Sequence, residues 1–263
     1  DDKLWVIVLN ITILHLWQTD TNVIFCRMEP LDVFENGAHY FLPNLSIDIV
    51  IIGYQEGKLK YLLLKIGEKW LLPGGYIFRD ESVDDAANRI LKERTSLEDP
   101  HLKFLSISGD RNRNFRDEFK QFALSLNIPW RKDYWLNDRF VTLCYYSLVD
   151  IEITHPIPGL FHEKAEWFSF EELPEIWMDH HSILLSARQR LMEDIRREPI
   201  TYNLLSEHFT MPQLHQLHQA ILQQDIDRSR FQKKMLSSGF FERLPQLKKD
   251  SPGRSPYLYR LKI

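Results

Sequence analysis

The chain has 263 residues, 44% of them apolar and 27% charged, and its 33 Lys and Arg against 37 Asp and Glu give a formal net charge of −4. These values exclude a disordered or fibrous chain and allow one large or two modest globular domains. They also exclude a polycation that coats nucleic acid indiscriminately. The two cysteines, Cys26 and Cys144, are too few for a disulfide framework or a cysteine-based zinc site. Because such scarcity is typical of a reducing compartment, we expect a cytoplasmic protein.

An apolar stretch at residues 4–17 is the one segment that resembles a targeting sequence. It is shorter than the ~20 residues of a membrane-spanning helix, and polar residues interrupt it. A signal or anchor would also need a basic leader, which Lys3 alone does not supply. We therefore expect no membrane span and treat residues 1–38 as an N-terminal extension, within which Met28 is a candidate start.

Residues 39–198 carry the patterns of a mixed domain of strands and helices. Two runs rich in β-branched and apolar residues, 45–54 and 60–65, are separated by a glycine turn and predict a β-hairpin. Ser82, with an acid three residues later, is a helix-capping pattern, and the apolar residues after it recur with helical spacing. Further strands are predicted at 103–108, 140–149 and 165–168, and further helices at 117–124 and 182–197. This order predicts an α/β (α+β) domain of stacked layers.

Residues 199–263 have a different pattern. A short helix is predicted at 202–209, a capping box from Thr210 to Gln213 opens a second helix, and Asp227 caps a third, which a hairpin follows. Three helices followed by a hairpin are typical of a winged helix-turn-helix domain. This stretch holds ten Lys or Arg against five Asp or Glu, so a basic domain follows an acidic one.

A loop-helix motif begins at Gly75. The sequence GYIFRDESVDDAANRILKERTSL is similar to the Nudix box, G-x5-E-x7-R-E-U-x-E-E-x-G-U, in which U is a bulky aliphatic residue. Ser96 stands where the pattern has a glycine at the helix exit. The residues that match in register are Gly75, Glu81, Arg89, Leu91, Glu93 and Leu97. This resemblance implies a Nudix-like αβα sandwich.

Two positions of the motif depart from the family pattern in a way that affects its chemistry. In a working box, the glutamate after the arginine and the second glutamate of the adjacent pair share one helix face and hold divalent ions. Here these positions are Ile90 and Arg94, neither of which ligates a cation. Glu93 remains, but its spacing from Arg89 favours an ion pair over a metal contact. We therefore expect no metal, no cofactor and no enzymatic activity.

The alternative is a Mg²⁺-dependent Nudix hydrolase of a nucleoside-diphosphate compound with a non-standard metal site. Its carboxylates would come from elsewhere in the chain, with Asp110, Glu118 and Asp138 as candidates. Such an enzyme would release phosphate from nucleotide sugars when magnesium is present.

A Nudix-like domain without its metal ligands, followed by a winged helix, resembles the bacterial Nudix-related transcriptional regulators, which are the NrtR-like proteins with their sugar-sensing AraR-like members. Matches dispersed along the chain agree, among them Trp167, Asp179-His180, Glu198-Pro199 and Ser251-Pro-Gly-Arg254. The resemblance implies a homodimeric regulator, for example of sugar metabolism, whose first domain binds an effector and whose second binds operator DNA. The effector in this family is ADP-ribose or a pentose. The long segment 110–138 departs from the family, in which a short loop is usual.

The effector site implied by this resemblance lies on the loop-helix unit and at neighbouring strand ends. Its candidate residues are Lys65, Trp70, Gly74, Gly75, Glu81, Arg89, Arg94, Asp138, Arg139 and Tyr146. The cations among them permit either a pentose or the diphosphate of ADP-ribose.

The third helix of the winged domain holds most of the candidate DNA contacts. Arginine and glutamine side chains can read guanine and adenine, whereas lysine more often contacts phosphate. Phe231 and Leu236 are predicted to face the core. The candidates are Arg228, Ser229, Arg230, Gln232, Lys233 and Lys234 on the helix and Lys248, Lys249 and Arg254 on the wing. The alternative is a basic helix in a peptide- or protein-binding winged module.

Overall fold

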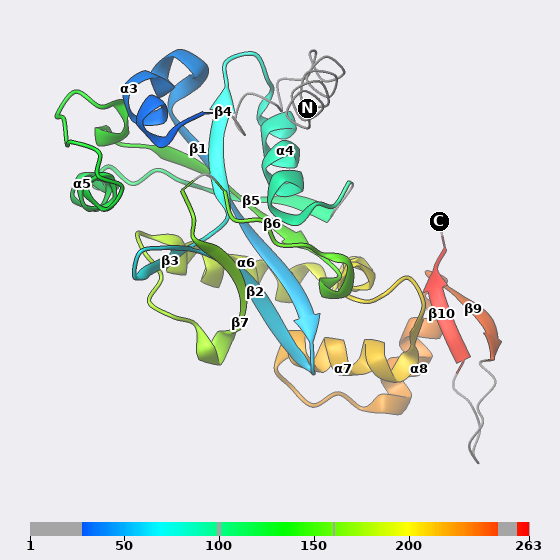
Figure 1. Ribbon diagram of the computed structural model, residues 1–263. Coiled ribbons are helices and arrows are strands. Elements are labelled where there is room, and N and C mark those ends of the chain that lie inside the picture. The colour runs from blue at the N-terminus through cyan, green and yellow to red at the C-terminus, as the bar shows by residue number, and fades with distance from the viewer. Residues whose placement is uncertain (1–27, 99–100, 160, 247–256, 263) are drawn as a thin grey trace, which may run out of the picture.

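A mixed β-sheet forms the centre of the first domain in the computed structural model, which describes residues 28–98, 101–159, 161–246 and 257–262 (Figure 1). Its strands are β1 Phe41–Gln55, β2 Lys58–Ile66, β3 Lys69–Leu71, β4 Gly74–Phe78, β5 His101–Ser108, β6 Val141–Leu148 and β7 Lys164–Ser169. They run in the order β3-β2-β1-β6-β5, with β4 paired to β1 and β7 paired to β2. Only the β1–β6 pair is parallel among the described strand pairs. The predicted β1–β2 hairpin is confirmed.

The two faces of this sheet are covered by α4 (Val83–Thr95) and α6 (His180–Asp194). Alternate residues of β1 face opposite sides, as the two-residue period of a strand requires. Ile49 and Ile51 pack with α4 in one apolar cluster, and Val50 and Ile52 pack with α6 in another, all four fully buried. The structure therefore confirms the expected αβα sandwich.

Helix α4 begins and ends at residues that the sequence singled out. The Ser82 hydroxyl accepts a hydrogen bond from the Asp85 amide at 3.1 Å, which is the predicted N-cap. The helix exit is Ser96, whose φ of 60° lies in the left-handed region that favours glycine. This residue keeps the backbone geometry of the motif at a conformational cost.

Helix α3 (Pro30–Tyr40) lies where a separate N-terminal extension was expected. Val33 and Phe34 are fully buried, and Met28 packs in the same cluster as Val33. The expected boundary between residues 38 and 39 therefore falls inside a helix that belongs to the domain core. Residues 1–27, including the apolar stretch, lie outside the described residues. No helix within the described ranges is both long and apolar enough to cross a membrane.

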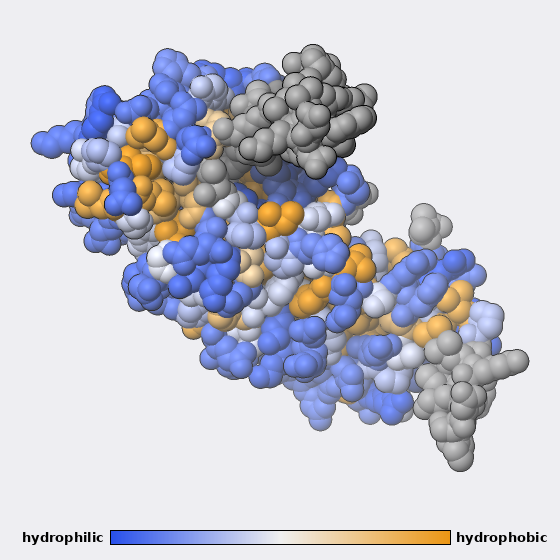
Figure 2. Space-filling model, viewed as in Figure 1, coloured by the Kyte–Doolittle hydropathy of each residue, from blue (hydrophilic) through white to orange (hydrophobic). Residues whose placement is uncertain are grey.

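The long segment 110–138 folds into α5 (Arg116–Ser125) and the short 3₁₀ helix η1 (Trp135–Asn137). This confirms the predicted helical piece at 117–124. Phe122 and Leu136 from this segment join Phe34 of α3 in a third apolar cluster. Figure 2 shows apolar surface gathered around α5, on the same side of the molecule as α3.

The C-terminal region confirms the winged helix and corrects one element. Its helices are α7 (Met211–Leu222) and α8 (Arg228–Ser237), and its sheet has the order β8-β10-β9, with β8 Phe209–Thr210, β9 Phe241–Gln246 and β10 Tyr257–Leu261. The capping box of α7 is present. The helix predicted at 202–209 is wrong, because the chain forms the 3₁₀ helix η4 (Ile200–Leu204) and then the strand β8. Phe209 pairs with Tyr259 of β10, a distant partner that the local pattern does not show.

The two domains share one apolar core. Leu217 and Ile221 of α7 lie in the same buried cluster as Tyr61 and Leu63 of β2 and Leu191 of α6. In Figure 1, α7 lies against the end of β2. The winged domain is therefore docked on the sheet domain through α7.

The left-handed backbone conformation of Ser96, at the end of α4, predicts how a glycine there would change stability. Ser96→Gly removes the strain of a side chain at φ 60° and should raise the free energy of unfolding by about 0.5–1 kcal/mol, after the extra entropy of glycine in the unfolded chain is subtracted. Urea unfolding followed by circular dichroism measures this difference. Unchanged or reduced stability would contradict the assignment of strain to this residue.

Candidate functional site

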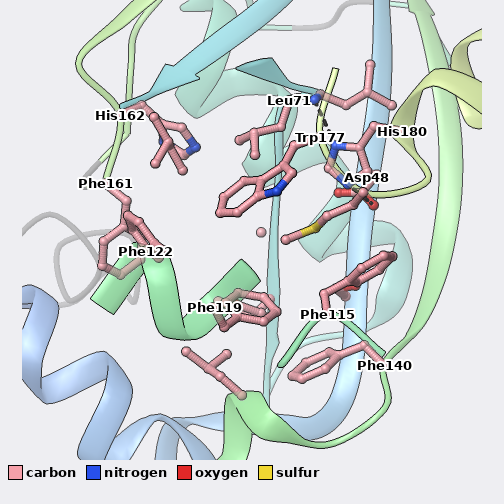
Figure 3. Close-up of a pocket in the computed structure, with 18 of the residues that line it drawn as sticks. Asp48, Leu71, Phe115, Phe119, Phe122, Phe140, Phe161, His162, Trp177 and His180 are labelled. Carbon is pink, nitrogen blue, oxygen red and sulfur yellow. Dashed lines mark hydrogen bonds and ion pairs between the residues drawn. The ribbon is translucent and has the colours of Figure 1, made fainter. Parts of the chain in front are cut away.

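A pocket lies between the sheet, the N-terminal end of α6 and the segment 110–138 (Figure 3). Its aromatic lining is Tyr76, Phe115, Phe119, Phe122, Phe140, Phe161 and Trp177. Its charged or polar lining includes Asp48, Arg94, Arg113, Asp138, His162 and His180. Figure 3 shows the indole of Trp177 across the cavity from Phe119. A mostly apolar cavity with several aromatic rings and a few converging polar groups is typical of a small-molecule site.

Residues 110–138 supply three of the seven aromatic rings that line the pocket. Phe119 and Phe122 lie on α5, and Phe115 lies just before it. Aromatic rings offer flat apolar surfaces on which a planar ligand group can stack. The segment that departs from the family pattern therefore supplies one side of the pocket.

Asp48 of β1 is the buried carboxylate of the pocket. Its side-chain oxygen Oδ2 lies 3.4 Å from His180 Nε2 and 3.8 Å from Arg113 Nη2, and the residue is 8% exposed. His180 Nδ1 accepts a hydrogen bond from the Leu72 amide at 3.0 Å, so a neutral ring carries its proton on Nε2, facing Asp48. A Cβ on Gly74 would lie 2.4 Å from Asp48 Oδ1, which explains why glycine is needed there.

Arg113 connects this carboxylate to the start of α6. Its Nε and Nη2 donate to the two carboxylate oxygens of Asp179 at 2.8 and 3.1 Å. Burial alone would raise the pKa of Asp179, but the hydrogen bonds from Arg113 and Ser108 outweigh it and hold that pKa below its usual value. Asp179 therefore stays ionised at neutral pH.

Arg94 places a positive charge at the pocket from α4. The residue is 5% exposed, and its Nη2 donates to the Gly74 carbonyl oxygen at 3.3 Å. Burial, with the charge of Arg94, lowers the pKa of His162 to about 3, so this neighbouring ring is neutral at physiological pH. The guanidinium is thus the cation that the motif helix presents where a Nudix hydrolase has a metal-binding glutamate.

The other residues of the motif hold the loop and the helix together. Arg89 Nη2 donates to Glu81 Oε1 at 2.6 Å, and Nη1 donates to Glu93 Oε1 at 3.3 Å. Glu81 also accepts the Phe78 amide at 2.7 Å. Ile90 is 1% exposed in the core. Among the residues that the structure describes, no three His, Cys, Asp or Glu side chains are grouped to hold a metal ion.

The structure brings four of the predicted effector residues to this pocket and places six elsewhere. The four in the lining are Gly74, Gly75, Arg94 and Asp138. The six others are Lys65, Trp70, Glu81, Arg89, Arg139 and Tyr146. Lys65 pairs with Glu163, Trp70 packs on Phe168, and Tyr146 donates a hydrogen bond to Asp194. Glu81 and Arg89 form an ion pair with each other, and Arg139 is exposed. They were chosen because they lie at strand ends or on the motif, but their side chains point into the core or away from the cavity.

Sequence reasoning missed most of the pocket. Asp48, Arg113, His162 and His180 come from separate elements, and no local pattern brings them together. The one available signal was the aromatic content of 110–138, which marks a segment with its own packing.

On the winged domain, α8 exposes all six of its predicted DNA-contact residues, Arg228, Ser229, Arg230, Gln232, Lys233 and Lys234. Lys248, Lys249 and Arg254 lie outside the described residues. Phe231 is buried as predicted, but the prediction for Leu236 is wrong because this residue is 47% exposed. Met235, one helical turn after Phe231, packs against the wing core instead.

The Arg113–Asp179 pair makes a pH prediction. Because the folded-state pKa of Asp179 is depressed, its contribution to stability is present at neutral pH and is lost as the pH falls through that lowered pKa. Asp179→Asn should reduce the free energy of unfolding by about 1–3 kcal/mol at pH 7 and by less at pH 3. Urea unfolding at both pH values tests this, with the exposed Asp80→Asn as control. An equal loss at both pH values would contradict the prediction.

Comparisons with known proteins agree with the two domains. Residues 43–187 match the NUDIX domain, and residues 201–261 match the NrtR DNA-binding winged helix domain. The ADPR responsive transcriptional repressor NtrR of Acinetobacter baylyi is 25% identical over 241 residues, which cover 86% of this chain and 85% of that protein.

Two solved structures are similar over most of the chain. Shewanella oneidensis NrtR in complex with a 27mer DNA has a TM-score of 0.65 and 25% identity, covering 83% of this chain and 93% of that one. A MutT/nudix family protein from Enterococcus faecalis has a TM-score of 0.62 and 22% identity, covering 93% and 98%, and shares the fold. The NUDIX match spans more than half of the sequence, so the chain belongs to the Nudix family and carries an NrtR-type winged helix domain after its Nudix domain.

Proposed function

We propose that this chain is a transcriptional repressor that binds operator DNA through its winged helix domain and responds to ADP-ribose bound in the pocket of its Nudix domain. The Acinetobacter relative is an ADPR responsive transcriptional repressor by name, and the Shewanella relative was solved in complex with DNA. The match to an NrtR DNA-binding domain favours this role over a peptide- or protein-binding module.

The observation that carries the effector proposal is the buried guanidinium of Arg94. A diphosphate needs positive charge wherever it binds, and a Nudix hydrolase supplies that charge with metal ions held by α4 glutamates. Here α4 itself supplies a fixed cation at the second of these positions. The site would therefore hold a diphosphate without the metal ions that promote its cleavage.

The aromatic wall favours ADP-ribose over a free pentose. The rings of α5 and Trp177 present stacking surfaces that suit an adenine base, whereas a pentose has no aromatic group to occupy them. A pentose would lay its C–H face on one ring and hydrogen-bond around Asp48 and His180, which leaves most of the aromatic wall uncovered. The alternative is a pentose effector and a role in sugar metabolism. The binding experiment below therefore compares pentoses with ADP-ribose.

The same residues argue against the hydrolase alternative. Of the candidate carboxylates Asp110, Glu118 and Asp138, only Asp138 lines the pocket. Asp48 lies against a histidine and an arginine, which compete with a metal ion for its oxygens. We infer that the protein binds its effector without hydrolysing it, and that it acts as a homodimer in the cytoplasm, where operator DNA is found.

A route from the pocket to the DNA-binding domain follows α6. Its N-terminal end carries Asp179 and His180 at the pocket. Towards its other end, Leu191 and then Ile195 pack in the core that contains Leu217 of α7. Because such a helix transmits shifts along its axis, an effector that moves its pocket end would move the winged domain.

Arg94→Gln tests the effector proposal. Removing the buried charge should weaken ADP-ribose binding at least tenfold, measured by isothermal titration calorimetry in EDTA, whereas Lys92→Gln on the exposed face of the same helix should change it little. Arabinose, xylose and ribose should bind more weakly than ADP-ribose. Binding that needs Mg²⁺, or that is unchanged in Arg94→Gln, would contradict the role of the guanidinium.

Salt dependence tests the DNA-binding role. Affinity for a duplex enriched by selection should fall linearly on a logarithmic salt scale, and Arg230→Gln should reduce the magnitude of that slope by about one. Lys92→Gln, on the Nudix domain, is the control. A binding partner whose affinity depends only weakly on salt would favour the peptide- or protein-binding winged module.

A further inference from the structure

The outward face of α8 carries one apolar side chain among polar ones. Phe231 and Met235 pack toward the wing core. The opposite face is formed by Ser229, Gln232, Lys233 and Leu236, which follow the spacing i, i+3, i+4, i+7 and therefore form one stripe along the helix. All four are exposed. Leu236 thus lies on the side of α8 that points away from its own domain.

Helix α8 follows the turn after α7, which is the place of the recognition helix in a helix-turn-helix. Its start is fixed by Asp227, whose side chain accepts the Arg230 amide at 2.7 Å. The turn before it is fixed by a hydrogen bond between His215 of α7 and the Ile226 carbonyl oxygen at 2.7 Å. In a helix-turn-helix, the second helix lies in the major groove with its N-terminal residues at the base edges. The stripe begins at that end with Ser229 and continues along the same side of α8 to Leu236, two turns later. Cations on either side of the stripe, among them Arg228 and Arg230, suit the flanking phosphates.

The major groove presents one apolar group, the C5-methyl of thymine. An isolated exposed leucine is ordinary on a protein surface. A leucine in line with a glutamine and a lysine on a base-reading stripe is different, because it has no hydrogen bond to offer and can recognise only an apolar contact. Resting on the proposed DNA-binding function, we propose that Leu236 is a specificity-determining residue that contacts a thymine methyl group in each operator half-site.

The test removes the methyl group from the DNA and the leucine side chain from the protein, each alone and both together. Duplexes are first selected from a random library with the full-length chain, and each thymine of the selected half-site is then replaced singly by deoxyuridine, which removes only the methyl group. At one thymine, the wild-type chain should bind the deoxyuridine duplex about threefold to fivefold more weakly, as expected for one lost methyl contact. Leu236→Ala should bind both duplexes equally at that position.

Matched controls separate recognition from folding. Leu185→Ala removes a leucine that is 42% exposed on α6 and should keep the wild-type preference for thymine. Leu236→Met keeps an apolar side chain and should keep part of the preference, and thermal unfolding should show that both Leu236 variants are folded.

Two results would overturn the proposal. A wild-type chain that binds every deoxyuridine duplex as well as its thymine parent has no methyl contact. If Leu236→Ala keeps the full preference for thymine over deoxyuridine, another residue makes the methyl contact. If selection enriches no duplex at all, the DNA-binding function itself fails and this proposal fails with it.

Discussion

The buried ion pairs of Arg89 fix the geometry on which the pocket depends. By binding Glu81 in the loop and Glu93 in the helix, Arg89 holds the segment between β4 and α4 in one conformation. The same guanidinium donates to the Tyr76 carbonyl oxygen at 2.9 Å, which ties α4 to β4. Since α4 is held against β4 in this way, Arg94 meets the Gly74 backbone and its charge lies at the pocket. The residues of the motif that remain are those that build the turn, and the residues that changed are those that would bind metal.

The segment 110–138 completes the pocket, and α6 connects the pocket to the winged domain. The segment closes one side of the pocket with aromatic rings that pack on α3 as well as on each other, so the part of the chain that departs from the family pattern belongs to the core. Helix α6 carries the polar side of the pocket at one end, and its apolar face belongs to the core shared with α7. A ligand that contacts Asp48, His180 or Arg113 therefore acts on a helix that the DNA-binding domain also contacts.

Local patterns predicted the elements whose signals are local. The cap at Ser82, the capping box at Thr210 and the β-branched run of β1 each depend on neighbouring residues, and each is found. Strand β8 was missed because two residues gain their strand conformation only from the distant β10. Helix α3 was assigned to an extension because nothing in its own sequence shows that Val33 and Phe34 meet the aromatic cores of the domain.

The candidate site was less predictable than the fold, for a related reason. Tyr146 lies on the same face of the sheet as Asp48, but its hydroxyl donates to Asp194 near the far end of α6, whereas Asp48 meets His180 at the first end. Trp70 packs against Phe168 in the core. The position of a residue along the sheet, which local patterns do not give, therefore decides whether it reaches the pocket. Asp48 could be placed only once β1, α6 and the segment 110–138 were known to meet. Leu236 was predicted to face the core with Phe231, but a five-residue step turns to another side of the helix, and Met235, four residues after Phe231, packs in the core instead.

The measurement that tests this account most directly is fluorescence anisotropy of the selected operator duplex with the full-length chain, titrated with ADP-ribose in the presence of EDTA, with the nucleotide then recovered and analysed by chromatography. The account predicts that ADP-ribose releases the DNA without any divalent ion and is recovered intact. Release that occurs only with Mg²⁺, accompanied by the appearance of AMP and ribose 5-phosphate, would contradict it.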